Sequence, residues 1–167
     1  MAKAPPLQFQ LLIKPSGSRC NLRCKYCFYY ETDRYFAGEP GHPDRQMTVE
    51  TMDAMVKELL SYRMPQSVFA WQGGEPTLCG LDFFRAVVEA EQRHGEDGQV
   101  VGNALQTNGL LINAEWAKFL TQYHFLVGLS IDGPRKLHEK YRGKSWQKTL
   151  DAAKAMRDHG TEFNILT

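Results

Sequence analysis

The sequence shows no excess of charge of either sign, because 20 Lys and Arg residues stand against 19 Asp and Glu residues in 167 positions. A net charge of +1 with the two signs interspersed provides no basic surface for a nucleic acid or an anionic membrane. No apolar run approaches the roughly 18 residues of a membrane-spanning helix. We therefore expect one globular domain in the cytoplasm, with no nucleic acid and no membrane as partner.

Cysteine is also scarce, but three of the four cysteines, Cys20, Cys24 and Cys27, lie within eight residues. A secreted disulfide scaffold would spread an even number of cysteines along a shorter chain, so this cluster favours a metal. A structural zinc needs four ligands, and neither Cys79 nor the histidines show a paired ligand spacing. A 4Fe-4S cluster can use three thiolates and leave one iron open. An unrelated zinc site or an incidental thiol cluster is the alternative, and Cys79 is expected to be structural packing.

Short β-rich segments alternate with helical segments along the chain. The strand patterns cover residues 7–14, 67–71, 100–106, 125–131 and 162–167, and the helical patterns cover residues 47–63, 81–94, 113–123 and 145–160. About five strands alternating with four helices predict an α/β fold, either a parallel sheet or a partial parallel (β/α) barrel. The strands are mostly continuous apolar runs, which predicts that both faces of the sheet are covered.

Two segments between these patterns are interpreted as loops: residues 31–45 and the segment that contains His138. Residues 31–45 contain two Gly and two Pro and predict one long loop after the clustered cysteines. His138 is interpreted as a loop histidine rather than a catalytic base. Ser145 is expected to cap the last helix.

Unusual residues follow four of the predicted strands. The segments are SGSRCNLRCKYCFYYE, WQGGEPTL, QTNG and SIDGP, in chain order. In parallel α/β folds, ligands bind where loops leave the carboxyl ends of the strands. We therefore expect these four segments to form one shared site.

The Gly-Gly pair of WQGGEPTL is suited to close contact with a ligand. Gly73 and Gly74 have no Cβ, and Pro76 favours an extended backbone at Glu75. Backbone carbonyls there could accept the ammonium group of a bound amino acid. The alternative is a tight turn that leaves Glu75 exposed.

Three later residues could bind a carboxylate or a ribose. Ser130 and Asp132 are two positions apart and face the same side of an extended backbone. Arg142 carries a planar guanidinium that suits bidentate carboxylate binding, and a solvated loop charge is its alternative interpretation.

Residues 20–27, CNLRCKYC, resemble the C-x3-C-x2-C signature of radical S-adenosylmethionine (radical SAM) enzymes, with an aromatic residue before the last cysteine. A wider set of segments resembles the anaerobic sulfatase-maturating enzymes between residues 11 and 166, including FAWQGGEPTLCGLDFF, LQTNGLLIN and FLVGLSIDGP. The resemblance implies a 4Fe-4S cluster on the clustered cysteines, with SAM as the second cofactor. It also implies that residues 1–167 are the amino-terminal part of a radical SAM core, without the barrel remainder and a cysteine-rich cluster domain.

The same resemblance implies roles for individual residues. It assigns the amino group of SAM to Gly73, Gly74 and Glu75, with Gln72 beside them, and the SAM carboxylate to Ser130 and Arg142. It further implies that Tyr26 supports the adenine, that Asp132 contacts the cofactor, that Asn108 orients the nucleoside or the substrate backbone, and that Tyr29 contacts the substrate. The general base is expected in the absent carboxyl-terminal part.

The implied activity is that of an oxidoreductase acting on a sulfatase polypeptide. A 5'-deoxyadenosyl radical removes hydrogen from the β-carbon of a Cys or Ser, and a second oxidation with proton loss leads to formylglycine. A low-potential protein such as flavodoxin or ferredoxin is the expected electron donor. Another peptide-modifying radical SAM enzyme, or a non-catalytic metal- or SAM-binding remnant, is the alternative.

Overall fold

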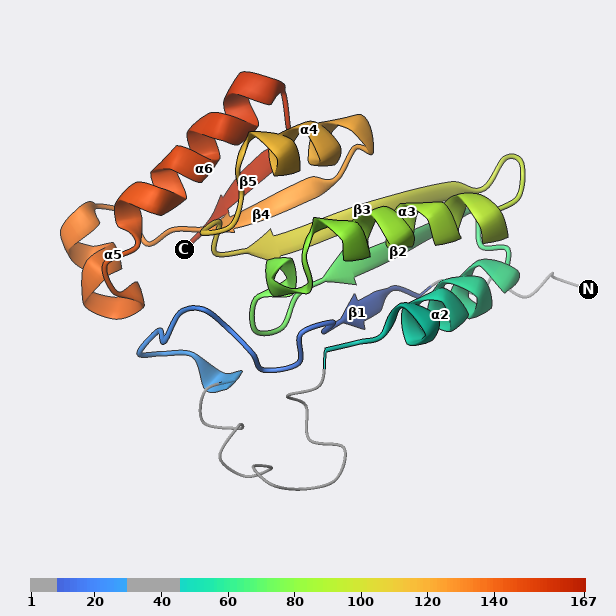
Figure 1. Cartoon of the computed structure of the whole chain (residues 1–167), viewed down its shortest axis with the longest axis horizontal. Coiled ribbons are helices and arrows are strands. Elements are labelled where there is room, and N and C mark those ends of the chain that lie inside the picture. Colours follow the sequence, from blue (N-terminus) through green and yellow to red (C-terminus); the bar gives the residue numbers. More distant parts are fainter. Residues whose placement is uncertain (1–8, 30–45) are drawn as a thin grey trace, which may run out of the picture.

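The computed structural model describes residues 9–29 and 46–167, so the predicted loop at 31–45 lies outside the described residues. Five parallel strands form one sheet in the order β1-β2-β3-β4-β5 (Figure 1). The strands are β1 (Leu11–Ile13), β2 (Gln66–Trp71), β3 (Val100–Thr107), β4 (Leu126–Ser130) and β5 (Phe163–Leu166). Because parallel neighbours require crossover connections, this topology confirms the predicted α/β fold.

Four helices connect the strands where the sequence patterns place them. They are α2 (Val49–Ser61), α3 (Leu81–His94), α4 (Ala114–Gln122) and α6 (Trp146–His159). Helix α2 begins after Thr48, whose hydroxyl accepts a hydrogen bond from the backbone N–H of Thr51. It buries Met52, Val56 and Leu59 along one stripe, which is the face that packs on the sheet. None of the described helices is long and apolar enough to cross a membrane.

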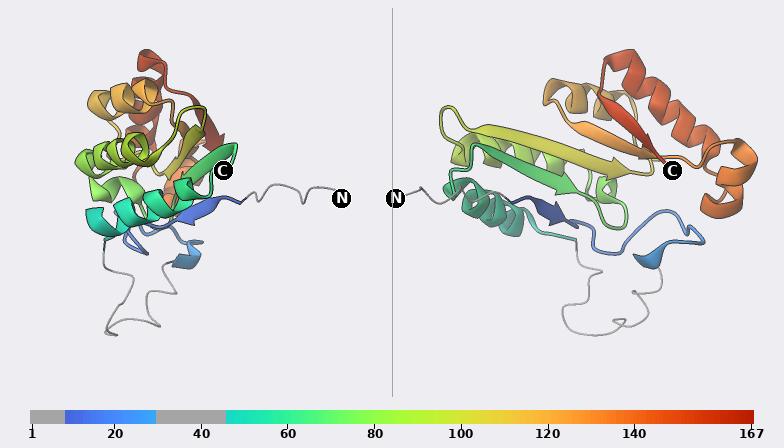
Figure 2. Two further views of the ribbon diagram at one scale, coloured as in Figure 1. Left: turned by 90° about the vertical axis from the view of Figure 1, so that its right-hand side faces the viewer. Right: turned by 180° about the vertical axis from the view of Figure 1, so that it is seen from behind.

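The connecting helices lie on one face of the sheet, as Figure 2 shows in its end-on view. On that side Phe69 and Trp71 of β2 are fully buried. On the other side the sheet lines an open hollow of about 240 Å³, whose wall includes Ala70, Ala104 and Gly128. For the described residues, the prediction that both faces are covered is therefore wrong. The strands are apolar on this side as well, and Leu12, Leu126 and Leu166 are exposed there because no described helix covers them.

Two further helical segments were not predicted. They are a 3-10 turn, η1 (Pro76–Cys79), and helix α5 (Arg135–Arg142). Helix α5 follows Pro134 and ends at Gly143, which has a positive φ of 80°. Proline before a helix and glycine after it are ordinary start and stop signals, so this helix could have been recognised. Its effect is to place His138 and Arg142 on a rigid element.

Candidate functional site

A cavity of about 230 Å³ lies where the loops leave the carboxyl ends of strands β1 to β4. Twelve of the thirteen residues singled out in the sequence line it: Cys20, Cys24, Tyr26, Cys27, Tyr29, Gln72, Gly73, Gly74, Glu75, Asn108, Ser130 and Arg142. A second cavity, of about 560 Å³, shares Tyr26, Ser130 and Arg142 with the first and adds Asp132. The structure therefore confirms that the four segments meet at one edge. They do so because parallel strands present their carboxyl ends at the same edge of the sheet.

The three clustered cysteines are free, half-buried thiols on the wall of the first cavity. Burial raises the pKa of Cys20 and of Cys24, and the nearby Arg142 guanidinium opposes this rise at Cys24. The Cys20 sulfur accepts hydrogen bonds from the backbone N–H of Leu22 at 3.3 Å and from Nδ2 of Asn108 at 3.7 Å. Donors of this kind stabilise a thiolate once it binds a metal.

Within the described residues, no three His, Cys, Asp or Glu side chains converge closely enough to hold a single metal ion. A closed tetrahedral zinc site takes four ligands, whereas three cysteine thiols line this cavity. Three thiols spaced along one cavity wall fit an iron-sulfur cluster, which distributes its thiolate ligands over several irons. Cys79 lies outside this wall; burial raises the pKa of its thiol to about 12, and its expected role is packing.

The segment carrying the cysteines is held against the Gly-Gly turn by backbone hydrogen bonds. The N–H of Gly74 donates to the carbonyl of Gly17 at 2.8 Å, and the N–H of Glu75 donates to the carbonyl of Arg19 at 2.7 Å. A Cβ on Gly74 would lie 2.1 Å from that Arg19 oxygen, so only glycine fits there. The close approach of a ligand to this turn stays a prediction, whereas the structure shows that the cysteine segment approaches Gly74 closely.

Glu75 is 1% exposed, so the alternative of an exposed turn carboxylate is wrong. Its Oε1 accepts from the N–H and hydroxyl of Thr77 and from the hydroxyl of Thr107, at 3.1, 2.6 and 2.7 Å. Its Oε2 accepts from the N–H of Asn108 at 2.8 Å. Burial raises the pKa of Glu75, and these hydrogen bonds oppose the rise. The carboxylate is thus occupied in joining the ends of β2 and β3.

Asn108 connects this carboxylate to the cysteine segment. Its Nδ2 donates to Oδ1 of Asn21 at 2.7 Å as well as to the Cys20 sulfur, and its Oδ1 accepts from the N–H of Leu110 at 3.0 Å. Asn21 was not predicted as a site residue, because a residue between two cysteines carries no signal of its own. The contact joins positions 87 apart in the chain.

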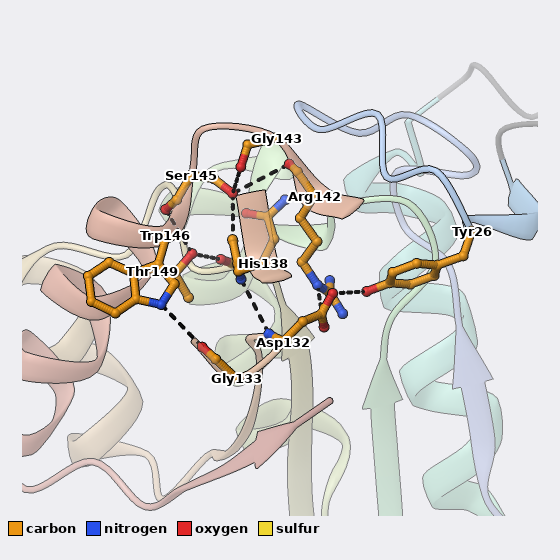
Figure 3. A network of polar contacts seen from close by, with 10 residues as sticks. Tyr26, Asp132, Gly133, His138, Arg142, Gly143, Ser145, Trp146 and Thr149 are labelled. Atoms are coloured by element: carbon orange, nitrogen blue, oxygen red, sulfur yellow. Dashed lines mark hydrogen bonds and ion pairs between the residues drawn. The ribbon is translucent and has the colours of Figure 1, made fainter. Parts of the chain in front are cut away.

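Asp132 holds two neighbouring side chains of the site, as Figure 3 shows. Its Oδ1 accepts from Nε of Arg142 at 2.8 Å, and its Oδ2 accepts from the hydroxyl of Tyr26 at 2.7 Å. The Arg142 guanidinium carbon lies 5.3 Å from the centre of the Tyr26 ring. Burial and the Asp132 carboxylate raise the pKa of Tyr26, so the phenol stays protonated and donates. The side chain of Arg142 is only 13% exposed, which excludes a solvated loop charge.

Behind Asp132 lies His138, which is fully buried in helix α5. The interpretation of His138 as a loop histidine is wrong, because α5 turns its imidazole toward strand β4 and the start of α6. Ser145 precedes α6 as predicted, but its hydroxyl makes no capping bond and contacts His138 Nε2 at 2.8 Å.

Comparison of the chain with known proteins identifies its family. Residues 15–167 match the sequence profile of the Radical SAM superfamily. The chain belongs to the radical SAM superfamily. Among its radical SAM relatives, a cysteine-type anaerobic sulfatase-maturating enzyme of Clostridium perfringens is 43% identical over 97% of this chain and 44% of its own length. A serine-type anaerobic sulfatase-maturating enzyme of Bacteroides thetaiotaomicron is 35% identical over 93% of this chain and 38% of its own length.

The solved structure of native anSMEcpe with bound AdoMet and Cp18Cys peptide superposes with a TM-score of 0.84. It is 43% identical, over 96% of this chain and 42% of that chain. AdoMet is another abbreviation of SAM. The radical SAM chain described here therefore spans less than half the length of the relatives that it matches.

Proposed function

We propose that this chain binds a 4Fe-4S cluster and SAM as the amino-terminal part of an anaerobic sulfatase-maturating enzyme, which oxidises a Cys or Ser of a sulfatase to formylglycine. The observation that carries the proposal is the shared cavity: three free thiols, the Gly-Gly turn and Arg142 line one wall. The structural relative with bound AdoMet and peptide supports the same choice of ligands.

The cysteine thiolates Cys20, Cys24 and Cys27 would hold the cluster. When bound, the cluster supplies the electron that splits SAM into methionine and a 5'-deoxyadenosyl radical. Cavity residues hold SAM for that step: backbone carbonyls at Gly73 and Gly74 accept its ammonium.

The carboxylate of SAM is assigned to Ser130 and Arg142. Nε of Arg142 donates to Asp132, and we assign the fork of its two terminal nitrogens to the carboxylate of SAM. Tyr26 supports the adenine, Asn108 orients the nucleoside through its fixed amide, and Tyr29 contacts the substrate. The cavity walls exclude water from the reacting atoms.

The remaining partners follow from this assignment. A sulfatase polypeptide is the substrate, and a low-potential protein such as flavodoxin or ferredoxin supplies electrons in the cytoplasm. Because the chain spans less than half of its relatives, we assign peptide oxidation to a longer protein that contains the rest of the barrel, a cysteine-rich cluster domain and the general base.

The test is anaerobic reconstitution with iron and sulfide, followed by addition of SAM, a reductant and a short sulfatase peptide carrying Cys or Ser. We expect this chain to bind SAM, and a longer protein that contains it to form 5'-deoxyadenosine and to convert the peptide to its formylglycine form by mass spectrometry. A reconstituted chain that binds no SAM would contradict the cofactor assignment. A longer protein that cleaves SAM but modifies no sulfatase peptide would contradict the maturase assignment alone.

A further inference from the structure

The buried imidazole of His138 joins two segments that both carry residues of the proposed SAM site. Its Nδ1 faces the backbone N–H of Asp132 at 3.3 Å, just after strand β4. Its Nε2 faces the hydroxyl of Ser145 at 2.8 Å, in the turn between α5 and α6. Figure 3 shows these contacts. His138 is 0% exposed and lines neither cavity, so it cannot touch a ligand there.

The hydrogen-bond partners determine which nitrogen carries the proton. A backbone N–H can only donate, so Nδ1 must be the acceptor and must carry no proton. Nε2 then carries the proton and donates to Ser145, whose own hydroxyl can donate to the carbonyl of Arg142 or Gly143, each 3.5 Å away. This arrangement satisfies both ring nitrogens in the neutral state.

We propose that neutral His138 is a positioning residue of the SAM site, which fixes the backbone at Asp132 and thereby the direction of Arg142 and Tyr26. We call the two hydrogen bonds of His138, with the N–H of Asp132 and the hydroxyl of Ser145, the bracket. The identity of the ligand rests on the proposed function, whereas the bracket is a property of this chain. Asp132 can place one oxygen on Arg142 and the other on Tyr26 only while its backbone keeps one orientation. The imidazole provides a fixed partner for that backbone.

The charges around the imidazole favour the neutral form. Burial, followed by the charge of Arg142, lowers the pKa of His138, while Asp132 and Glu139 oppose this with smaller effects. A proton on Nδ1 would also direct an N–H at the N–H of Asp132. Protonation would therefore break the bracket rather than strengthen it.

The chain offers a matched set of variants. In His138→Asn the side-chain oxygen takes the position of Nδ1 and can accept from the backbone N–H of Asp132. In His138→Gln the amide lies near the former position of Nε2, which leaves the N–H of Asp132 without a partner. Trp146→Phe is the control, because it removes another hydrogen bond between the same two segments, from Nε1 of Trp146 to the Gly133 carbonyl at 3.2 Å.

Two readouts are measured on the reconstituted chain: the dissociation constant for SAM, and amide hydrogen exchange at Asp132 resolved by fragmentation mass spectrometry. We expect His138→Gln to weaken SAM binding about tenfold and to accelerate Asp132 exchange by a similar factor. His138→Asn and Trp146→Phe should stay within about threefold of the parent in both readouts. Equal SAM affinity and equal Asp132 exchange in His138→Gln and the parent would overturn the proposal, as would a His138→Asn variant as impaired as His138→Gln.

If His138→Gln does not fold, nitrogen NMR of the histidine-labelled parent before cluster loading replaces it. A proton on Nε2 supports the proposal, and a proton on Nδ1 overturns it. A parent that binds no SAM contradicts the proposed function, whereas Asp132 exchange, which needs no ligand, still tests the bracket.

Discussion

Oε2 of Glu75 lies 2.8 Å from the backbone nitrogen of Asn108, and this hydrogen bond joins the ends of neighbouring strands β2 and β3 beneath the cavity. The two residues are 33 positions apart in the sequence. Asn108 in turn donates to Asn21 and Cys20, so the buried carboxylate helps to hold the proposed cluster-binding segment in place. A residue that appears in the sequence as a ligand contact is therefore also a structural anchor.

Glu75→Gln tests this anchor. Every partner of the Glu75 carboxylate is a donor, so an amide NH₂ placed there opposes at least one of them. We expect the free energy of unfolding in urea to fall by about 1–3 kcal/mol. Glu89→Gln, on the exposed side of α3, is the control and should change stability by less than about 0.5 kcal/mol. An equal effect of both substitutions on the free energy of unfolding would refute the role of Glu75 as a structural anchor.

Gly74→Ala tests the contact between the Gly-Gly turn and the cysteine segment. The new Cβ would lie 2.1 Å from the Arg19 carbonyl oxygen, which is backbone and cannot rotate away. We expect a loss of at least about 2 kcal/mol in unfolding free energy, together with poor cluster loading. In Gly102→Ala the nearest atom lies 3.8 Å away, and stability should be unchanged or rise by up to about 1 kcal/mol. Equal stability of the two variants would contradict this close approach.

The buried carboxyl of Glu91, which lies away from the proposed site, should make the free energy of unfolding depend on pH. Burial raises its pKa to about 7, and among the described residues its two carboxylate oxygens accept only from Nδ2 of Asn103, each at 3.0 Å. Because the folded-state pKa exceeds the unfolded value of about 4.3, the stabilising contribution is complete below pH ~4.3 and is lost as the pH rises through about 7.

Glu91→Gln should remove this dependence while keeping the acceptor for Asn103. Urea unfolding from pH 5 to pH 8 should show the parent losing stability relative to the variant, by as much as about 3 kcal/mol at the upper end. A difference between parent and variant that stays constant over this range would show that Glu91 titrates normally.

Cluster loading distinguishes the three clustered cysteines from the fourth. Cys24→Ala should abolish stoichiometric iron and sulfide after anaerobic reconstitution, because it removes one of three thiolate ligands. Cys79→Ala should load as the parent does, because burial keeps that thiol protonated with a pKa of about 12. Stoichiometric zinc without sulfide, or full iron loading in Cys24→Ala, would count against the assignment.

Much of this molecule was predictable because the relevant information is local. Apolar periodicity identified the five strands and four of the helices, and the spacing of Cys20, Cys24 and Cys27 predicted the segment that we propose to bind the cluster. The meeting of four loops at one edge also followed from the sequence, since parallel strands present their carboxyl ends on the same side.

Other features depend on contacts between residues that no local pattern connects. The sequence left open whether Glu75 is exposed or buried, and burial follows from four donors that only the packed loops of β2 and β3 bring together. His138 had no recognisable signal, because its role arises when α5 packs its imidazole between the end of β4 and the start of α6. Periodicity reports which side of an element is apolar, whereas a buried polar group is defined by the partners that folding supplies.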